Sequence, residues 1–150
     1  MTTTVTDLMR KKLITIEESA SVQQAAKKMM DENVSSLLVV DENNRPIGLI
    51  TERDLVRKVC IKDAYTSKIT TRDIMSSPLI TIESGSSPSE AVDIMLQNNV
   101  RHLLVVDNNK SSRHKNKPIG IITPLDFTRS EDYSGSDNND TIEMLLEYYI

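Results

Sequence analysis

The chain has 150 residues and a formal net charge of −4, with one phenylalanine, four tyrosines and no tryptophan. This length allows one ordinary domain or two small modules that pack together, because a module of about 60 residues is only marginally stable alone. The acidic balance argues against nucleic acid as the main partner, since neutralising phosphates requires a concentrated basic face.

The ends and the cysteine content indicate the compartment. The N-terminus has no basic segment leading into an apolar one, and no stretch of the chain approaches a membrane-spanning length. The single cysteine, Cys60, excludes an intramolecular disulfide and suits a reducing environment. We therefore expect a soluble, cytoplasmic protein.

The first half of the chain predicts a strand, a helix, two strands and a second helix. Ser21 and Gln24 form a capping box ahead of apolar residues at helical spacing, and Asn33 is a natural helix stop. The run after Asn33 is apolar without alternation, as expected of a strand covered on both faces. The five elements lie at Leu13–Ile16, from Ser21 to Asn33, at Val34–Val40, at Ile47–Ile50 and from Thr51 onward.

The second half repeats this order, shifted by 66 residues at first and by 72 after a six-residue insertion. Asp7-Leu8-Met9 corresponds to Asp73-Ile74-Met75. Ser87 and Glu90 form the second capping box, with Pro88 at the first helical position. The second set of elements lies at Leu79–Ile82, from Ser87 to Asn99, at Val100–Val106, at Ile119–Ile122 and from Thr123 onward.

The repeat predicts two units, 5–61 and 72–129, joined by a polar linker at 62–71 and followed by a tail at 130–150. The tail begins with an acidic, flexible link and ends in a short amphipathic helix. Such a short helix is not stable in isolation, so it docks on its own chain or a sister subunit, or it binds a separate target. The apolar stripe of the tail helix consists of Ile142, Leu145, Leu146 and Tyr149.

The insertion at 108–117 contains several basic residues. We interpret it as a solvated turn in preference to a nucleic-acid contact.

Each copy closes on a glycine, a threonine and an aspartate at fixed spacing, which are Gly48, Thr51 and Asp54, then Gly120, Thr123 and Asp126. Threonine and aspartate at the start of a helix face its positive end, where free N–H groups favour an anion. The carboxylate can accept two hydrogen bonds from a vicinal diol, and the hydroxyl can reach a sugar or phosphate oxygen. A ribose beside a phosphate suits this arrangement.

The alternative is a variant capping box that needs no ligand. Two features favour the ligand. Aspartate is shorter than the glutamate or glutamine that usually closes such a box, and both copies keep threonine and aspartate while changing the residues between them.

A pair of cationic residues distinguishes the second copy. Arg101 and His102 begin an otherwise apolar strand, where the first copy has Ser35 and Ser36. A phosphate would satisfy these cations, and so would a neighbouring carboxylate or solvent. Arg53, within the first glycine-threonine-aspartate segment, would add a third cation.

The Asp-hydrophobic-Met opening, the Val-x-x-Leu-x-Val-Val-Asp strand and the closing Gly-x-x-Thr-x-x-Asp, each occurring twice, resemble a tandem pair of CBS domains, the Bateman module. The resemblance implies an α/β (α+β) fold of two βαββα units packed about a pseudo-twofold axis, with clefts that bind AMP, ADP, ATP or S-adenosylmethionine. It implies that Asp54 and Asp126 each hold a ribose beside Thr51 and Thr123. It also implies that Arg101 and His102 reach phosphates. The positions implied to flank adenine are Thr15, Ile16, Ile50, Thr81, Ile82 and Ile122.

These observations leave several functions open. The leading hypothesis is a regulatory, energy-sensing module that binds an adenine nucleotide, forms a homodimer and signals to a protein effector in trans, with no cofactor required. An assembly module with vestigial sites is the second, and a purine-metabolism enzyme fragment or a nucleic-acid adaptor is less favoured. No nucleophile has a recognisable base, Cys60 is expected to be a small core residue, and the histidines lack metal-site spacing, so we expect neither a catalytic nor a metal centre.

Overall fold

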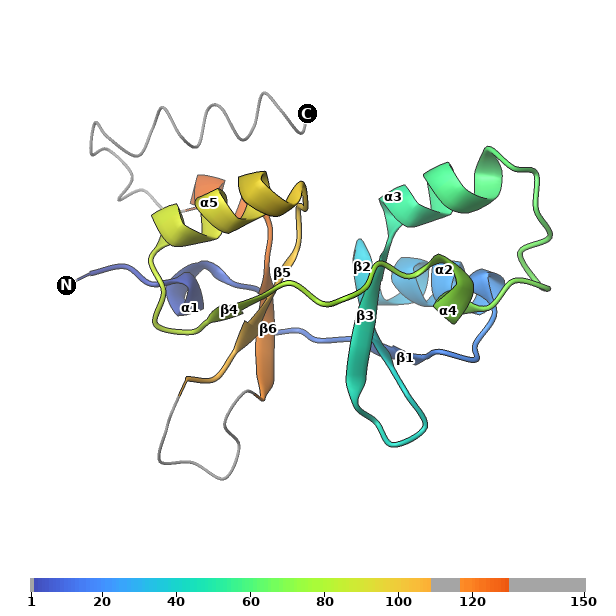
Figure 1. Cartoon of the computed structure of the whole chain (residues 1–150), viewed down its shortest axis with the longest axis horizontal. Helices are drawn as coiled ribbons and strands as arrows, with labels where there is room; N and C mark the ends of the chain where they lie inside the picture. Colours follow the sequence, from blue (N-terminus) through green and yellow to red (C-terminus); the bar gives the residue numbers. More distant parts are fainter. Residues whose placement is uncertain (1, 109–116, 130–150) are drawn as a thin grey trace. The chain divides into compact units, whose positions relative to one another are not determined.

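The computed structural model describes residues 2–108 and 117–129 and divides the chain into two compact units (Figure 1). Leu13–Leu79 forms one unit, which we call the continuous unit. The described residues before Leu13 and after Leu79 form the other, which we call the discontinuous unit. The sequence predicts that each copy of the repeat starts near residue 5 or 72, whereas the spatial division falls about eight residues later in both places.

Each unit contains a three-stranded mixed sheet with the same topology. In both sheets the first strand runs parallel to the second, and the third runs antiparallel to the second. The sequence order of strand, helix, strand, strand and helical turn therefore confirms the α/β (α+β) class and the two βαββα copies. The strands are β1 (Thr15–Glu17), β2 (Ser36–Val40) and β3 (Pro46–Thr51), then β4 (Thr81–Glu83), β5 (Leu103–Val106) and β6 (Pro118–Ile122).

Helices α2 and α5 begin at the two predicted capping boxes. The Ser21 hydroxyl accepts a hydrogen bond from the Gln24 N–H at 3.1 Å, and the Ser87 hydroxyl accepts one from the Glu90 N–H at 3.2 Å. Both helices end at an asparagine in the left-handed backbone conformation, which asparagine tolerates better than most residues. The helices are α2 (Val22–Glu32) and α5 (Pro88–Asn98), and their C-caps are Asn33 and Asn99.

A helical segment follows each of the two threonines, as predicted, but the two segments differ in type. After Thr51, the short helix α3 (Glu52–Leu55) continues into the π-helical turn η1 (Val56–Cys60). After Thr123 the chain forms the 3₁₀ helix η2 (Pro124–Arg129). The expectation that Cys60 lies in the core is wrong, because η1 turns Val59 inward and leaves Cys60 exposed.

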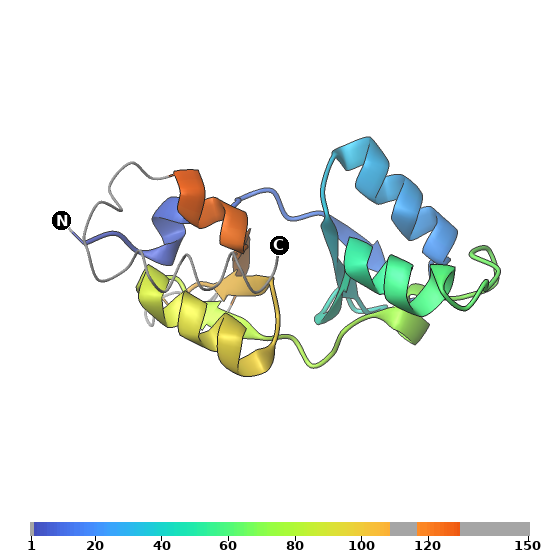
Figure 2. The same ribbon diagram turned by 90° about the horizontal axis from the view of Figure 1, so that it is seen from above.

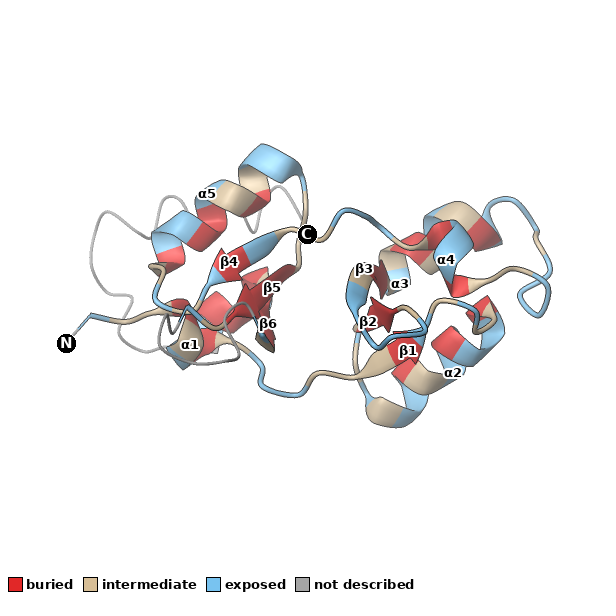
Figure 3. Ribbon diagram, turned by 60° about the horizontal axis from the view of Figure 1, so that its bottom comes forward, coloured by how far each residue is buried: buried red, intermediate tan, exposed pale blue. Residues whose placement is uncertain are grey.

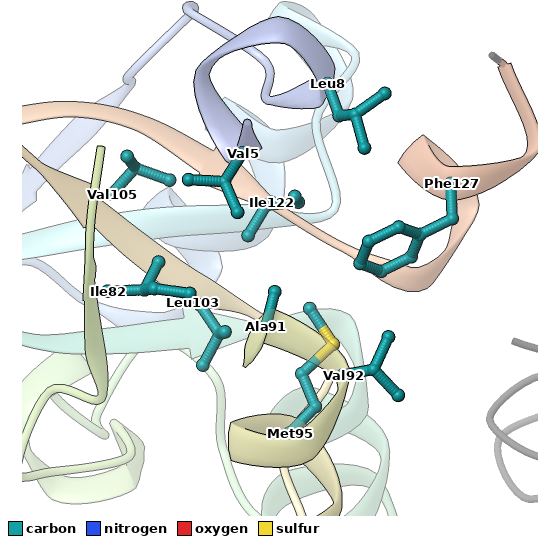
Figure 4. Packing of buried hydrophobic residues seen from close by; sticks show 10 residues of the cluster. All are labelled: Val5, Leu8, Ile82, Ala91, Val92, Met95, Leu103, Val105, Ile122 and Phe127. Atoms are coloured by element: carbon teal, nitrogen blue, oxygen red, sulfur yellow. The ribbon is translucent and has the colours of Figure 1, made fainter. Parts of the chain in front are cut away.

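Two short helices precede the sheets, and the sequence interpretation missed both. Helix α1 (Val5–Leu8) buries Val5 and Leu8 in the discontinuous unit, against core residues that include Ile122 and Phe127 (Figure 4). Helix α4 (Thr71–Ile74) buries Thr71 and Ile74 in the continuous unit. We call residues 4–10 the first leading segment and residues 70–76 the second. Each leading segment therefore completes the unit that contains the other copy's sheet.

The core of each unit is mostly aliphatic and comes from the sheet, the long helix and the exchanged leading segment, with Phe127 of η2 added in the discontinuous unit (Figures 3 and 4). Leu37–Val40 of β2 and all four residues of β5 are buried without alternation, as the apolar runs predict. Helices α2 and α3 contact each other and lie against β2 and β3, respectively (Figure 2).

Within the described residues, no helix is both apolar and long enough to cross a membrane. The predicted C-terminal helix and the basic residues of the insertion from 109 to 116 lie outside the described part of the chain.

Candidate functional site

Thr51 and Asp54 form a buried pair where β3 ends and α3 begins. The Asp54 Oδ2 atom accepts hydrogen bonds from the Thr51 N–H at 3.0 Å and from the Thr51 hydroxyl at 3.1 Å. The Asp54 N–H in turn donates to the Thr51 hydroxyl at 3.2 Å, which closes a capping box. Asp54 is only 7% exposed, so its carboxylate lies almost wholly beneath the surface.

Thr123 and Asp126 form the matching pair at the end of β6. The Asp126 Oδ2 atom accepts from the Thr123 N–H at 2.8 Å and from the Thr123 hydroxyl at 3.2 Å. In the tighter η2 turn, the Asp126 N–H donates to the Thr123 carbonyl at 3.0 Å. The Asp54 N–H instead donates to the Thr51 hydroxyl. Asp126 is 0% exposed.

Two further threonine-aspartate boxes provide an internal comparison. The Thr4 N–H donates to Asp7 at 2.9 Å, and the Thr70 N–H donates to Asp73 at 3.1 Å. Aspartate therefore closes capping boxes readily in this chain, so its shorter side chain does not by itself favour a ligand over a cap. Asp7 and Asp73 are exposed, however, so burial separates the pairs at Asp54 and Asp126 from ordinary caps.

The second carboxylate oxygen of each buried aspartate faces a leading segment. The Ser76 hydroxyl donates to Asp54 Oδ1 at 3.2 Å, and Lys58 Nζ lies 3.1 Å from the same oxygen. In the other unit, Arg10 Nε lies 3.5 Å from Asp126 Oδ1. Oδ2 is thus used by the cap in both units, while Oδ1 receives a hydroxyl or a cation.

The glycine of each motif allows the leading segment to approach the sheet. Ser76 and Leu49 exchange two backbone hydrogen bonds of 2.7 and 3.0 Å, and Arg10 and Ile121 exchange two of 2.8 and 2.9 Å. A Cβ atom on Gly48 would lie 2.9 Å from the Ser76 carbonyl oxygen. These glycines are therefore explained by close packing of the exchanged segment.

The strand register brings Arg101 and His102 to the same end of the sheet as Thr123. Leu103 pairs with Ile122, so the residues just before Leu103 and just after Ile122 lie at one edge of the discontinuous unit. Both Arg101 and His102 are partly buried. The corresponding edge of the continuous unit pairs Ser36 with Thr51.

The remaining predicted site residues are divided between the units. Arg53 is partly buried on α3, and Thr15 and Thr81 begin the parallel strands β1 and β4. The four isoleucines predicted to flank adenine have their side chains in the hydrophobic cores, so contact with a ligand at these positions would be through the backbone. They are Ile16 and Ile50 in the continuous unit, and Ile82 and Ile122 in the discontinuous unit.

Sequence reasoning missed three side chains that contact the buried aspartates: Arg10, Ser76 and Lys58. A signal for Lys58 was present, because it lies four residues after Asp54 on a predicted helix. Arg10 and Ser76 are equivalent under the 66-residue shift, but their contacts arise from pairing far along the chain.

Comparison with known proteins gives related sequences that are mostly uncharacterized. An uncharacterized protein of Methanopyrus kandleri is 37% identical over 129 residues, which are 86% of this chain and 63% of that protein. The chain thus spans less than two thirds of that relative's length. It is 32% identical over 124 residues to inosine-5'-monophosphate dehydrogenase of Nitrosopumilus maritimus, where the match covers 83% of this chain but 23% of the enzyme.

Solved structures share the fold over nearly the whole chain. A conserved CBS domain protein of Thermoplasma acidophilum has a TM-score of 0.79 at 21% identity and covers 98% of this chain and 78% of its own. The hexameric CBS-CP12 protein of bloom-forming cyanobacteria has a TM-score of 0.79 at 23% identity, with 99% of this chain and 81% of its own covered. The CBS domain family model matches residues 5–60 and 72–132. The chain therefore belongs to the CBS domain family and carries two copies of the domain, which is the organisation of a regulatory module.

Proposed function

We propose that this tandem CBS module senses an adenosine-containing ligand, namely AMP, ADP, ATP or S-adenosylmethionine, and signals its presence to a protein effector in trans. One observation carries the proposal. Asp54 and Asp126 are buried carboxylates that use one oxygen for a threonine cap and turn the other toward a hydroxyl or a cation.

A helix cap alone does not require a buried carboxylate. Removing an ionised carboxylate from water is unfavourable unless hydrogen bonds and opposite charges offset the loss of hydration. Asp7 and Asp73 make the same box while exposed, so burial at Asp54 and Asp126 calls for a further role. Binding the two hydroxyls of a ribose is such a role, because a carboxylate oxygen can accept from a diol as it accepts from Ser76.

The phosphate groups of the ligand are assigned to the basic residues near these pairs. Arg101 and His102 lie at the edge that also holds Thr123, and Arg53 lies next to Asp54 in the chain. Regulation requires the ligand to bind two states of the module with different affinity. We assign no catalytic step, so bound nucleotide is expected to be recovered unchanged.

Isothermal titration of the full chain with AMP, ADP, ATP and S-adenosylmethionine tests the proposal. The double variant Asp54→Asn/Asp126→Asn keeps the shape of both side chains but removes both charges, and we expect it to lose ligand binding. Asp7→Asn/Asp73→Asn is the matched control, because it changes the same kind of box at exposed sites. Equal binding by the parent and the first double variant would show that these aspartates do not form the site.

A second candidate function is assembly, and exposed apolar side chains favour it. Among the described residues of the continuous unit, Met30, Val56, Ile61 and Tyr65 are between 55% and 75% exposed. Exposed apolar side chains that gather into a patch mark interaction surfaces. The CBS-CP12 neighbour is hexameric. We propose that this chain self-associates, as a homodimer at least. Light scattering with and without nucleotide separates the two functions, because pure scaffolding predicts no dependence on ligand.

A further inference from the structure

Arg10 and Ser76 occupy the same place in the two units but differ in charge. Each forms a two-hydrogen-bond backbone bridge to the residue after a motif glycine, Ile121 for Arg10 and Leu49 for Ser76. Each side chain then reaches the Oδ1 atom of the buried aspartate, at 3.5 Å from Arg10 Nε and at 3.2 Å from the Ser76 hydroxyl. The comparison is therefore between a cation and a neutral hydroxyl at one structural position.

The cation beside Asp54 is local, whereas Arg10 reaches Asp126 from the other end of the chain. Lys58 lies one helical turn after Asp54, 3.1 Å from its Oδ1 atom, and also donates to the Ile74 carbonyl at 2.9 Å. The 72-residue shift pairs Lys58 with Ser130, which carries no charge. Arg10 thus supplies to Asp126, from a distant segment, the charge that Lys58 supplies to Asp54.

We propose that Arg10 determines ligand specificity at Asp126 by changing partner on binding, so that this aspartate accepts a nucleoside only when the nucleoside carries a phosphate. This inference rests on the proposed function. The sugar hydroxyls take the Asp126 Oδ1 atom, and Arg10 moves from the carboxylate to the phosphate. The Arg10 side chain is 42% exposed, so part of the guanidinium already faces solvent.

Charge balance explains why both parts of the ligand are needed. Phosphate alone would draw Arg10 away from a carboxylate that is 0% exposed, and a buried charge that loses an opposite charge is strongly unfavourable. An uncharged nucleoside would displace Arg10 and offer the guanidinium no new anion. A nucleoside phosphate supplies sugar hydroxyls to Asp126 and a phosphate to Arg10, so both groups keep a partner. The planar guanidinium suits the exchange because its fork of N–H groups matches the geometry of both carboxylate and phosphate.

Asp54 is expected to behave differently. A sugar hydroxyl that replaces the Ser76 hydroxyl exchanges one neutral donor for another, and Lys58 can remain between Asp54 and the Ile74 carbonyl. The site at Asp54 therefore does not require a phosphate. The edge that carries Arg101 and His102 adds positive charge near Thr123, whereas Ser35 and Ser36 stand at the equivalent positions of the continuous unit.

The test compares AMP with adenosine by isothermal titration, in an Asp54→Asn background that leaves Asp126 as the reporting site. We expect AMP to bind more tightly than adenosine by at least about tenfold, the size of one charge-assisted hydrogen bond. Arg10→Ser copies the residue of the other unit and should reduce this preference to the part that Arg101 and His102 contribute. Arg10→Lys keeps the charge and should retain part of it. Thermal denaturation of each variant checks that it is folded. If Arg10→Ser does not fold, the comparison of Arg10→Lys with the parent still tests the inference.

The reciprocal variant is Ser76→Arg in an Asp126→Asn background, which should increase the preference of the Asp54 site for AMP over adenosine. A ratio of AMP to adenosine affinity that is the same in Arg10→Ser and its parent overturns the inference and leaves the proposed function intact. Equal losses for both ligands also overturn it, because they would show a structural role for Arg10. If the wild-type chain binds none of adenosine, AMP, ADP, ATP and S-adenosylmethionine, both the proposed function and the inference are wrong.

Discussion

Gly48 and Gly120 show how single atoms determine the packing of the leading segments. A Cβ atom on Gly48 would lie 2.7 Å from Met75 Sδ and 2.9 Å from the Ser76 carbonyl oxygen. On Gly120 it would lie 2.5 Å from Met9 Sδ and 2.7 Å from the Arg10 carbonyl oxygen. A methionine can move its end group, but a carbonyl that belongs to a backbone bridge cannot move without breaking that bridge.

We therefore predict that Gly120→Ala destabilises the protein by about 1–3 kcal/mol, the usual range for overpacking, because the leading segment must shift. Gly48→Ala should behave similarly. Gly85→Ala is the control, since its new Cβ would meet only the flexible end of the Asn108 side chain, at 2.9 Å. Urea denaturation measures all three. Equal stability of Gly85→Ala and Gly120→Ala would show that the close approach is not restrictive.

Residue patterns in the sequence located part of the candidate site. Thr51, Asp54, Thr123 and Asp126 could be identified because their spacing is local and occurs twice. Their burial could not be read from spacing, since the same Thr-x-x-Asp pattern forms exposed boxes at Asp7 and Asp73. The contact between Arg10 and Asp126 spans most of the chain and depends on which sheet the leading segment joins.

At the scale of elements, the leading segments determine which residues form each core. Leu8 is 8% exposed and belongs to the discontinuous unit, while its repeat equivalent, Ile74, is 5% exposed and belongs to the continuous unit. Each segment is close in sequence to one sheet and packed with the other. The pairing can therefore be tested by observing which sheet responds to a change in each segment.

We predict that Leu8→Ala lowers amide protection in β5 and β6, and that Ile74→Ala lowers it in β2 and β3. Each substitution leaves a cavity in one core, at a cost of about 2–5 kcal/mol. Hydrogen exchange measured by mass spectrometry resolves the two sheets. The paired variants act as controls for each other, and the opposite pattern, with Leu8→Ala affecting β2 and β3, would contradict the exchange of leading segments.

The sequence predicted the βαββα order because its signals are local: capping boxes, asparagine stops and unalternating apolar runs. It could not predict the exchange, because Asp7-Leu8-Met9 and Asp73-Ile74-Met75 are nearly identical and fit either sheet. The sequence also did not indicate which type of helical turn follows Thr51 and Thr123. Short π and 3₁₀ turns depend on how a few carbonyls are satisfied by tertiary packing, which spacing does not show.

For the molecule as a whole, the exposed apolar side chains of the continuous unit determine the prediction about assembly. Ile61 is 74% exposed and Met30 is 72% exposed. In the described part of the discontinuous unit, Leu125 is the comparable residue, at 57%. An interface built on the first two residues would be sensitive to a charge, since burying an unpaired carboxylate is unfavourable.

We predict that Ile61→Glu weakens self-association by at least about tenfold, because one buried aliphatic side chain contributes roughly 1.5–3 kcal/mol. Leu125→Glu adds the same charge to the other unit and should leave assembly unchanged. Sedimentation velocity over a range of concentrations measures both. A larger effect of Leu125→Glu than of Ile61→Glu would show that the interface lies on the discontinuous unit.

The exchange of leading segments has a consequence for the isolated halves of the chain. A fragment of residues 1–66 contains every element of one unit, but its leading segment is the one that normally completes the other. In such a fragment the leading segment can pack on the fragment's own sheet, or it can pack on the sheet of a second identical fragment. The intact chain therefore resembles a domain-swapped dimer whose two protomers have been joined end to end. In either form the fragment would place Arg10 where Ser76 belongs, and Asp54 would then face two cations instead of one.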